Sequence, residues 1–204
     1  MVKWEIVVTK TALLVIDMNN NFLKGGMPFE IPSGRAIIPN LKKLIEVCRS
    51  LKAPIIYFTQ AYRRNGSNVG LARDLSNLDF PPKGEVACEG TEGIEIYDEL
   101  KPEENDIIIK KPRYDGFYFT DLESVLRGLE VDTLIITGVV TDCCINFTAA
   151  SAFQRGFKVI VVSDCTAARD KETQEITLKT EARLIGEVAT HSEIIERLRK
   201  HHLK

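Results

Sequence analysis

The sequence predicts an α/β fold: a three-layer α/β/α domain, Rossmann-like, with a mostly parallel six-stranded sheet. Two observations carry this prediction. Short runs rich in β-branched residues recur along the chain, and each is followed by a helical pattern. The runs LLVID, IIYFT and LIITGVV are apolar on both faces, as expected of parallel strands that are covered by helices on either side.

The expected strands follow one another at spacings that leave room for a helix or a long loop. They cover residues 12–18, 54–60, 106–111, 133–138, 157–163 and a weaker run at 187–190. Between the first two strands, apolar residues repeat at helical spacing; these are Ile37, Ile38, Leu41, Leu44, Ile45, Cys48 and Leu51.

Two further helices are predicted from their start and stop signals. Thr120 and Glu123 form a capping-box pattern that opens a helix with Leu122, Val125, Leu126 and Leu129. After the fourth strand, Thr141 or Asp142 is expected to cap a helix that contains Ile145, Ala149 and Phe153 and stops at Gly156.

The stretch from residue 61 to 93 breaks the alternation of strands and helices. It contains five glycines and the pair Pro81-Pro82, with little periodicity. A connection of this length is usually a lid or an arm that joins subunits.

The length and net charge of the chain limit the number of domains and the kinds of partner that we expect. The chain has 204 residues, 44% of them hydrophobic, which fits one domain over residues 1–204. The formal net charge of -2 gives no electrostatic reason to expect nucleic acid or an anionic membrane as a partner. We therefore expect small molecules, or a second copy of the chain, as partners.

Cysteine and histidine usage narrow the chemistry. The chain has five cysteines and no C-x-x-C pair, which predicts free thiols and a cytoplasmic location. The three histidines are His191, His201 and His202, all close to the C-terminus. This placement disfavours a Ser-His-Asp site, a Cys-His site and a core metal site with several histidines.

Two polar residues stand at the carboxyl ends of predicted strands, where open parallel sheets bind ligands. Asp17 ends the first strand, and Lys111 ends the third, next to Lys110. Each has an alternative reading: Asp17 as the start of an Asx-type turn, and Lys111 as a solvated surface lysine.

Cys144 carries the strongest signal for catalysis. Its expected place is the first turn of the helix after the fourth strand, where the helix dipole and free N–H groups favour a thiolate and a lowered pKa. The alternative is that Cys144 is a small buried apolar residue. Cys143 points elsewhere on a helix and is expected to serve packing.

Several segments together make the chain similar to the isochorismatase-like cysteine hydrolases. They are ALLVIDMNNNF, KPRYDGFYFTDL, GVVTDCCI, VVSDCTAARD and LIGEV. That family includes nicotinamidases, N-carbamoylsarcosine amidase and ureidoacrylate amidohydrolases.

The resemblance implies a role for each matching position. It makes Asp17 the general acid/base, Lys111 the catalytic lysine and Cys144 the nucleophile. It also implies a cis peptide bond at Val139-Val140 and an oxyanion hole formed by the N–H groups of Val140 and Cys144. Homodimers or homotetramers are common among such proteins, so we expect a homo-oligomer.

Departures from subfamily patterns narrow the expected substrate. Residues 59–62 read T-Q-A-Y where metal-dependent nicotinamidases have a D-x-H motif, so we expect no metal and no other cofactor. Members that cleave isochorismate lack the nucleophilic cysteine, which is present here. What remains is an amidase or ureidohydrolase that cleaves a small C–N bond through a covalent acyl-enzyme.

Substrate contacts are expected from four residues. Phe22, Tyr62 and Tyr118 are expected to wall the pocket. Arg169 stands where some relatives bind a substrate carboxylate, and its alternative is a surface ion pair with Asp170 or Glu172.

Three other functions stay open at this point. They are a metal-dependent nicotinamidase, a thiol-redox enzyme that uses Cys143 with Cys144 or Cys165, and a non-catalytic small-molecule-binding domain. In the non-catalytic case, Asp17, Lys111 and Cys144 need not converge.

Overall fold

A computed structural model describes residues 2–74 and 78–202 of the chain. Its centre is a six-stranded sheet of order β3-β2-β1-β4-β5-β6, in which every neighbouring pair is parallel. The strands are β1 (Thr11–Ile16), β2 (Ile55–Gln60), β3 (Ile107–Lys111), β4 (Thr133–Val139), β5 (Lys158–Ala167) and β6 (Glu187–Ala189). The predicted α/β fold with six strands is therefore confirmed.

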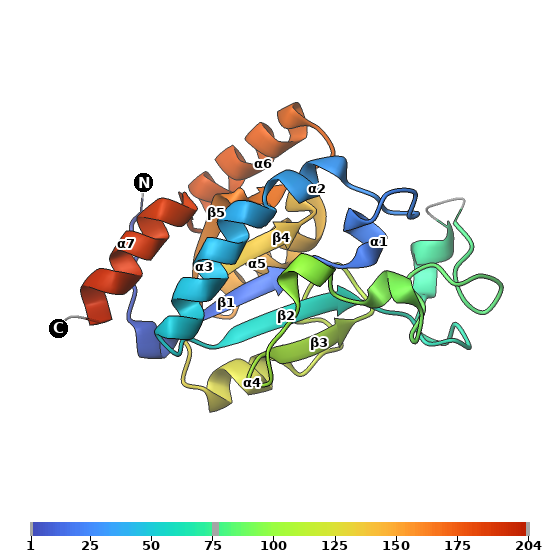
Figure 1. Ribbon diagram of the computed structural model, residues 1–204, viewed down its shortest axis with the longest axis horizontal. Coiled ribbons are helices and arrows are strands. Elements are labelled where there is room, and N and C mark those ends of the chain that lie inside the picture. The colour runs from blue at the N-terminus through green and yellow to red at the C-terminus, as the bar shows by residue number, and fades with distance from the viewer. Residues whose placement is uncertain (1, 75–77, 203–204) are drawn as a thin grey trace.

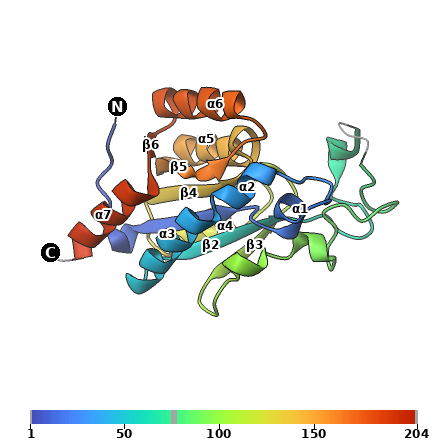
Figure 2. The ribbon, with the colours of Figure 1, turned by 45° about the horizontal axis from the view of Figure 1, so that its top comes forward.

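Helices cover both faces of this sheet, which completes the three layers (Figure 1). One layer holds α3 (Ile38–Ser50) and α7 (His191–His202), which pack against each other. The other holds α4 (Leu122–Gly128), α5 (Asn146–Gln154) and α6 (Lys171–Leu184). Two short helices, α1 (Asn20–Leu23) and α2 (Pro32–Ala36), lie at the carboxyl ends of the central strands, as Figure 2 shows.

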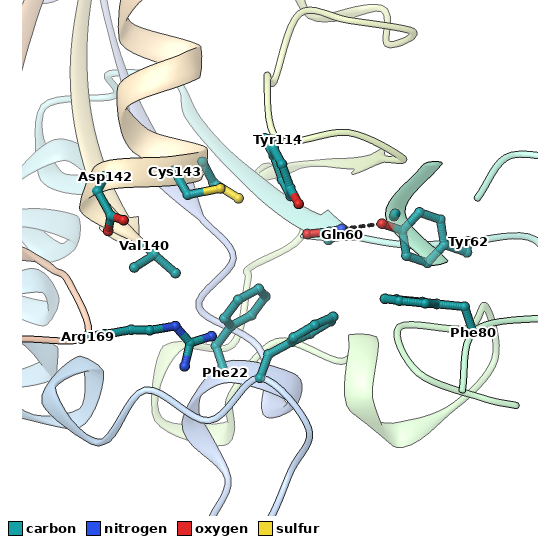
Figure 3. A pocket seen from close by; sticks show the side chains of 12 residues that line it. Phe22, Gln60, Tyr62, Phe80, Tyr114, Val140, Asp142, Cys143 and Arg169 are labelled. Carbon is teal, nitrogen blue, oxygen red and sulfur yellow. Dashed lines mark hydrogen bonds between the residues drawn. The ribbon is translucent and has the colours of Figure 1, made fainter. Parts of the chain in front are cut away.

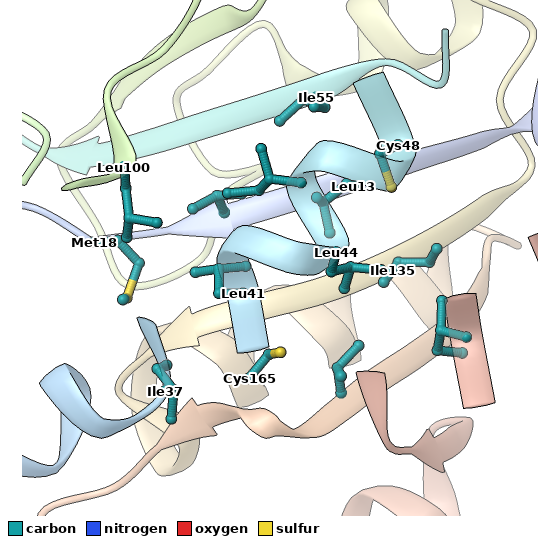
Figure 4. Close-up of a cluster of buried hydrophobic side chains, with 14 of the residues drawn as sticks. Leu13, Met18, Ile37, Leu41, Leu44, Cys48, Ile55, Leu100, Ile135 and Cys165 are labelled. Atoms are coloured by element: carbon teal, nitrogen blue, oxygen red, sulfur yellow. The ribbon is translucent and has the colours of Figure 1, made fainter. Parts of the chain in front are cut away.

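The alternation of side chains along β1 divides the core into two clusters. Leu13 and Val15 belong to the cluster under α3, whereas Leu14 and Ile16 belong to the cluster under α4 and α5. All six residues of β1 are buried, which explains why the five that follow Thr11 are apolar. Figure 4 shows the first cluster, where the predicted apolar stripe of α3 lies on the sheet.

Strand β5 runs four residues beyond its predicted end. Ile136 of β4 pairs with Val161, but Gly138 pairs with Thr166, so the register shifts and β5 carries extra residues at this point. Such a bulge lengthens the strand, and the apolar pattern of the sequence does not predict it.

Two predicted helix caps are wrong. The helix after β3 begins at Leu122, and the Thr120 hydroxyl accepts from the Leu122 N–H at 3.3 Å. The Glu123 carboxylate forms ion pairs with Arg127 and Arg155 and does not complete the predicted capping box. After β4, neither Thr141 nor Asp142 caps the helix, because the chain first forms a π-helical turn at Thr141–Ile145.

The irregular stretch after β2 folds back over the carboxyl ends of the strands. It contains a 3-10 turn at Gly70–Asp74 and a small apolar cluster of Tyr62, Val69, Phe80 and Ala87, on which Phe29 packs. Among the described residues, no helix has the length and apolar character needed to cross a bilayer.

Candidate active site

Asp17 directly follows β1, beside the point where Ile16 pairs with Gly138 of β4. Its backbone takes the left-handed conformation, with φ of 53°, directly after β1 ends. Gly138 of β4 is the neighbour of Ile16, and a Cβ on it would lie 2.0 Å from the Ile16 carbonyl oxygen. Glycine at position 138 thus allows β4 to approach the strand that presents Asp17.

Lys111 is the centre of the polar cluster. Its Nζ lies 2.7 Å from Oδ2 of Asp17 and 3.3 Å from Sγ of Cys144, and it donates to the Arg113 carbonyl at 3.1 Å. These three contacts match the three N–H groups of the ammonium. The side chains of Asp17 and Lys111 are fully buried, so neither the Asx-turn reading nor the surface-lysine reading holds. Lys110, by contrast, is exposed.

Cys144 is brought to this cluster by the π-helical turn after β4. Its residue is 2% exposed, and the turn leads directly into α5. The peptide bond between Val139 and Val140, at the start of this turn, is cis. The three side chains that the resemblance pairs as a catalytic set therefore meet around one amine nitrogen.

Burial and charge set the protonation of this cluster. Burial opposes the charge on Lys111, but Asp17 and Cys144 outweigh it, so the pKa of Lys111 is raised. The pKa of Cys144 is also raised, by the hydrogen bond with Cys143, by burial and by the Asp17 charge, against the opposing effect of Lys111. The expectation of a lowered pKa for Cys144 is therefore wrong: its resting form is the thiol, beside a Lys111–Asp17 ion pair.

A cavity of about 190 Å³ opens beside the thiol (Figure 3). Val140 and Cys144, whose N–H groups are the expected oxyanion donors, both line it. The other lining residues come from segments far apart in the sequence; they are Phe22, Phe29, Gln60, Tyr62, Ala72, Phe80, Tyr114, Asp142, Cys143 and Arg169.

Three of the four predicted substrate contacts reach the cavity. Phe22 and Tyr62 form part of its wall, and the exposed Arg169 lies at its edge. Among the described residues Arg169 has no ion-pair partner, because the Asp170 carboxylate instead accepts from the Thr173 amide and hydroxyl. The ion-pair alternative for Arg169 is thus wrong.

The fourth predicted contact, Tyr118, lies outside the cavity. Its residue is 51% exposed, and its ring packs on Phe119 with centroids 4.4 Å apart. Tyr114, which follows Lys111 by three residues, lines the cavity instead. The bend after β3 returns Tyr114 to the pocket, whereas Tyr118 points to solvent.

Four aromatic rings form a connected wall that sequence reasoning found only in part. Phe22 stacks on Phe29 with centroids 5.4 Å apart, Phe29 contacts Phe80 at 6.1 Å, and Tyr62 meets Phe80 edge-on at 5.4 Å. Phe29 and Phe80 lie in loops whose sequence has no periodicity, so no local pattern could have identified them.

Potential metal ligands are not gathered within the described residues. No group of three or more histidine, cysteine, aspartate or glutamate side chains there is arranged to hold a metal ion. His191 binds the Asp164 carboxylate, with Nδ1 2.7 Å from Oδ2, away from the cavity.

Comparison with known proteins decides the family. The model of the isochorismatase domain matches residues 11–193. The chain belongs to the isochorismatase family. The crystal structure of a cysteine hydrolase from Pseudomonas syringae pv. phaseolicola superposes with a TM-score of 0.93 at 33% identity, and the match covers 98% of this chain and 97% of that one.

Two curated proteins that are similar to this chain carry names of different function. A probable inactive nicotinamidase of Arabidopsis thaliana is 37% identical over 164 residues, which is 79% of this chain and 83% of that protein. A ureidoacrylate amidohydrolase of Rhizobium rhizogenes is 29% identical over 198 residues, or 89% of this chain and 80% of that protein. Family membership therefore leaves the substrate to be argued from the cavity.

Proposed function

We propose that the chain is a cysteine hydrolase that cleaves a C–N bond of a small amide, ureide or N-carbamoyl compound. The observation that carries this proposal is the meeting of Asp17, Lys111 and Cys144 around the Lys111 ammonium, at 2.7 Å and 3.3 Å. A binding domain without catalysis would have no reason to bury a thiol, an amine and a carboxylate together, because burying charges is costly.

The first half-reaction forms an acyl-enzyme. Asp17 accepts the thiol proton as the sulfur of Cys144 attacks the carbonyl carbon of the substrate. The N–H groups of Val140 and Cys144 bind the oxyanion of the tetrahedral intermediate. The C–N bond then breaks, and the leaving amine takes the proton from Asp17.

The second half-reaction restores the thiol. Asp17 takes a proton from water, whose oxygen attacks the thioester or thiocarbamate carbon, and the C–S bond breaks. The proton held by Asp17 returns to the sulfur of Cys144. Throughout both steps Lys111 stays charged, stabilising first the carboxylate and then the developing thiolate.

The raised pKa of Cys144 agrees with this sequence of events. A thiol that is neutral at rest must lose its proton during attack, so it needs a base within the same buried cluster. The Oδ1 atom of Asp17 has no hydrogen-bond partner among the described residues, which leaves it available to accept that proton.

Other functions are less well supported. A metal-dependent nicotinamidase requires ligands that residues 59–62 lack. A redox pair of Cys144 with Cys165 is disfavoured because Cys165 is buried in the core under α3 and does not line the cavity. Adjacent Cys143 and Cys144 lie in a helical turn, whose geometry does not suit a disulfide.

The test is ammonia release from a panel of small carboxamides, ureides and N-carbamoyl acids, followed by mass spectrometry of the quenched enzyme. We expect turnover of at least one class and a substrate-derived mass on the peptide that contains Cys144. A Cys144→Ala variant that folds normally yet releases ammonia at the wild-type rate would contradict the proposal.

A further inference from the structure

Gln60 is a polar residue of the cavity that the mechanism leaves without a role. It is the last residue of β2 and pairs in register with Lys111, the last residue of β3. Residues paired in this way present their side chains on the same face of the sheet. The register therefore places Gln60 beside the lysine that holds the catalytic cluster, and its residue is only 4% exposed.

The side-chain amide of Gln60 is held at one end. Its Nε2 donates to the Tyr62 hydroxyl at 2.5 Å, and the Tyr62 ring meets Phe80 edge-on at an angle of 88°. Tyr62 is itself buried, so the amide is oriented by a packed partner and not by solvent.

The other end of that amide is open to the cavity. Figure 3 shows the Gln60 oxygen on the side away from Tyr62, toward the part of the cavity where Tyr114 and Cys143 lie. Within the described part of the chain, no group donates to it. A buried amide oxygen without a donor lowers affinity for any ligand that cannot supply one.

Two hydrogen-bond acceptors near the Lys111 cluster remain free for a substrate. The three N–H groups of Lys111 are taken by Asp17, Cys144 and the Arg113 carbonyl. Oδ1 of Asp17 and Oε1 of Gln60 are acceptors that no described group donates to, and Tyr114, Asp142 and Arg169 are further polar residues of the cavity wall. A carboxamide carries N–H groups on one side of its carbonyl only, whereas a ureide carries them on both sides.

We propose that Gln60 is a specificity-determining residue that selects ureides over carboxamides, an inference that rests on the proposed hydrolase function. The departing nitrogen faces Asp17, which protonates it. The N–H on the other side of the carbonyl donates to Oε1 of Gln60. A carboxamide has a carbon at that place and leaves the Gln60 oxygen unpaired.

Two substrates that differ at one atom test this role. N-carbamoylglycine and succinamate both release ammonia and both end in a carboxylate, but the first has N–H where the second has CH₂. We expect wild type to favour N-carbamoylglycine in kcat/KM by about ten-fold or more, since one side of the carbonyl loses its hydrogen bond in succinamate. If another ureide proves the better substrate, it and its CH₂ analogue replace this pair.

Matched variants separate recognition from folding. Gln60→Met keeps the length of the side chain but removes the acceptor, so kcat/KM for the ureide should fall about ten-fold while that for the CH₂ analogue stays within about two-fold. Gln60→Glu keeps a hydrogen-bond acceptor, and the Tyr62 hydroxyl can donate to its carboxylate. This variant should still prefer the ureide to its CH₂ analogue, even if kcat/KM falls for both substrates. Tyr62→Phe releases the amide and should reduce the preference.

The outcomes distinguish this inference from the proposed function. Equal losses for both substrates in Gln60→Met, or a wild type that does not discriminate between N–H and CH₂, would overturn the role of Gln60 alone. A wild type that hydrolyses no amide and no ureide would contradict the proposed function itself.

Discussion

The sulfur of Cys144 lies 3.3 Å from the Nζ atom of Lys111, although the two residues belong to segments on opposite sides of β1. Lys111 extends from β3 past the ends of β2 and β1 to reach the turn that follows β4. Four consecutive strands of the sheet must therefore keep their register for the contact to exist. The sheet is in this sense the support of the catalytic cluster.

Substitution of the two adjacent cysteines, one at a time, should show which of them is the nucleophile. Cys144→Ala removes the attacking sulfur, so we expect a loss of activity by several orders of magnitude. Cys143→Ala should retain most activity because Cys143 is not the attacking group; it forms a hydrogen bond with Cys144 and is one of the residues that line the cavity. Steady-state kinetics with circular dichroism as a folding check decide the matter, and an equal loss in two well-folded variants would reject Cys144 as the nucleophile.

Removal of the Lys111 charge should make Cys144 less reactive. The Lys111 ammonium lowers the pKa of this thiol, so Lys111→Met should raise it further and slow alkylation by iodoacetamide at neutral pH. The variant also leaves Asp17 buried without a counter-charge, which should cost about 3 to 5 kcal/mol of stability. Rates are compared by mass spectrometry of the Cys144 peptide below the unfolding transition. An unchanged rate would assign Lys111 to packing or substrate contact.

Activity should not depend on a divalent metal. We expect turnover to survive exhaustive dialysis against a chelator, because residues 59–62 supply no D-x-H ligands. The measurement is ammonia release before and after dialysis, with a metal analysis of the same samples. Loss of activity that zinc or iron restores would reveal a metal site after all.

Glu181 should make stability depend on pH. Burial raises its pKa to about 8, and its carboxylate oxygens have no hydrogen-bond partner among the described residues. The unfolded chain binds fewer protons here than the folded one between pH 4.5 and about 8, so this residue's contribution to stability falls as pH rises through that window. The change is on the order of 5 kcal/mol.

The matched variant is Glu181→Gln, which cannot ionise. Its free energy of unfolding, from urea titrations at several pH values, should fall less steeply than that of wild type between pH 5 and 8. Identical pH profiles would mean that Glu181 is solvated in the folded protein.

We expect the protein to form a homodimer or homotetramer. Phe119 and Phe147 are 71% and 51% exposed, and large exposed apolar side chains often mark subunit contacts. Light scattering at assay concentration tests the assembly, and Phe119→Glu with Phe147→Glu should shift it toward the monomer. A monomeric wild type with full activity would refute the prediction.

The fold was predictable because its strands are buried on both faces. Runs such as that of β1 are apolar without interruption, and in a chain of this length that pattern is typical of parallel strands between two helical layers. The positions of Asp17 and Lys111 could be picked out as polar residues at strand ends, Asp17 after the buried β1 and Lys111 at the end of β3, in which Ile108 and Lys110 are exposed. The end of β5 was not predictable, because a bulge extends the strand without a change in composition.

The walls of the cavity were much less predictable than its polar centre. Tyr114 and Tyr118 are both aromatic and four positions apart, and only the path of the loop decides which one enters. The protonation of Cys144 was also misjudged from sequence. Its sequence position indicates a helix start, but the burial and the Cys143 contact that raise its pKa are tertiary features.

The aromatic wall draws on α1 and on the segment between β2 and β3, whereas the reacting groups stand on or directly after the strands. Natural variation in those loops would change the shape of the cavity, and so the substrates that fit it, without moving the thiol, the amine or the carboxylate. Exchange of residues 61–93 between relatives would therefore be expected to change the size and shape of the substrates accepted, while the chemistry and the contact of Gln60 stay the same. The loops thus set the shape of the cavity, whereas the sheet holds the reacting groups together with Gln60.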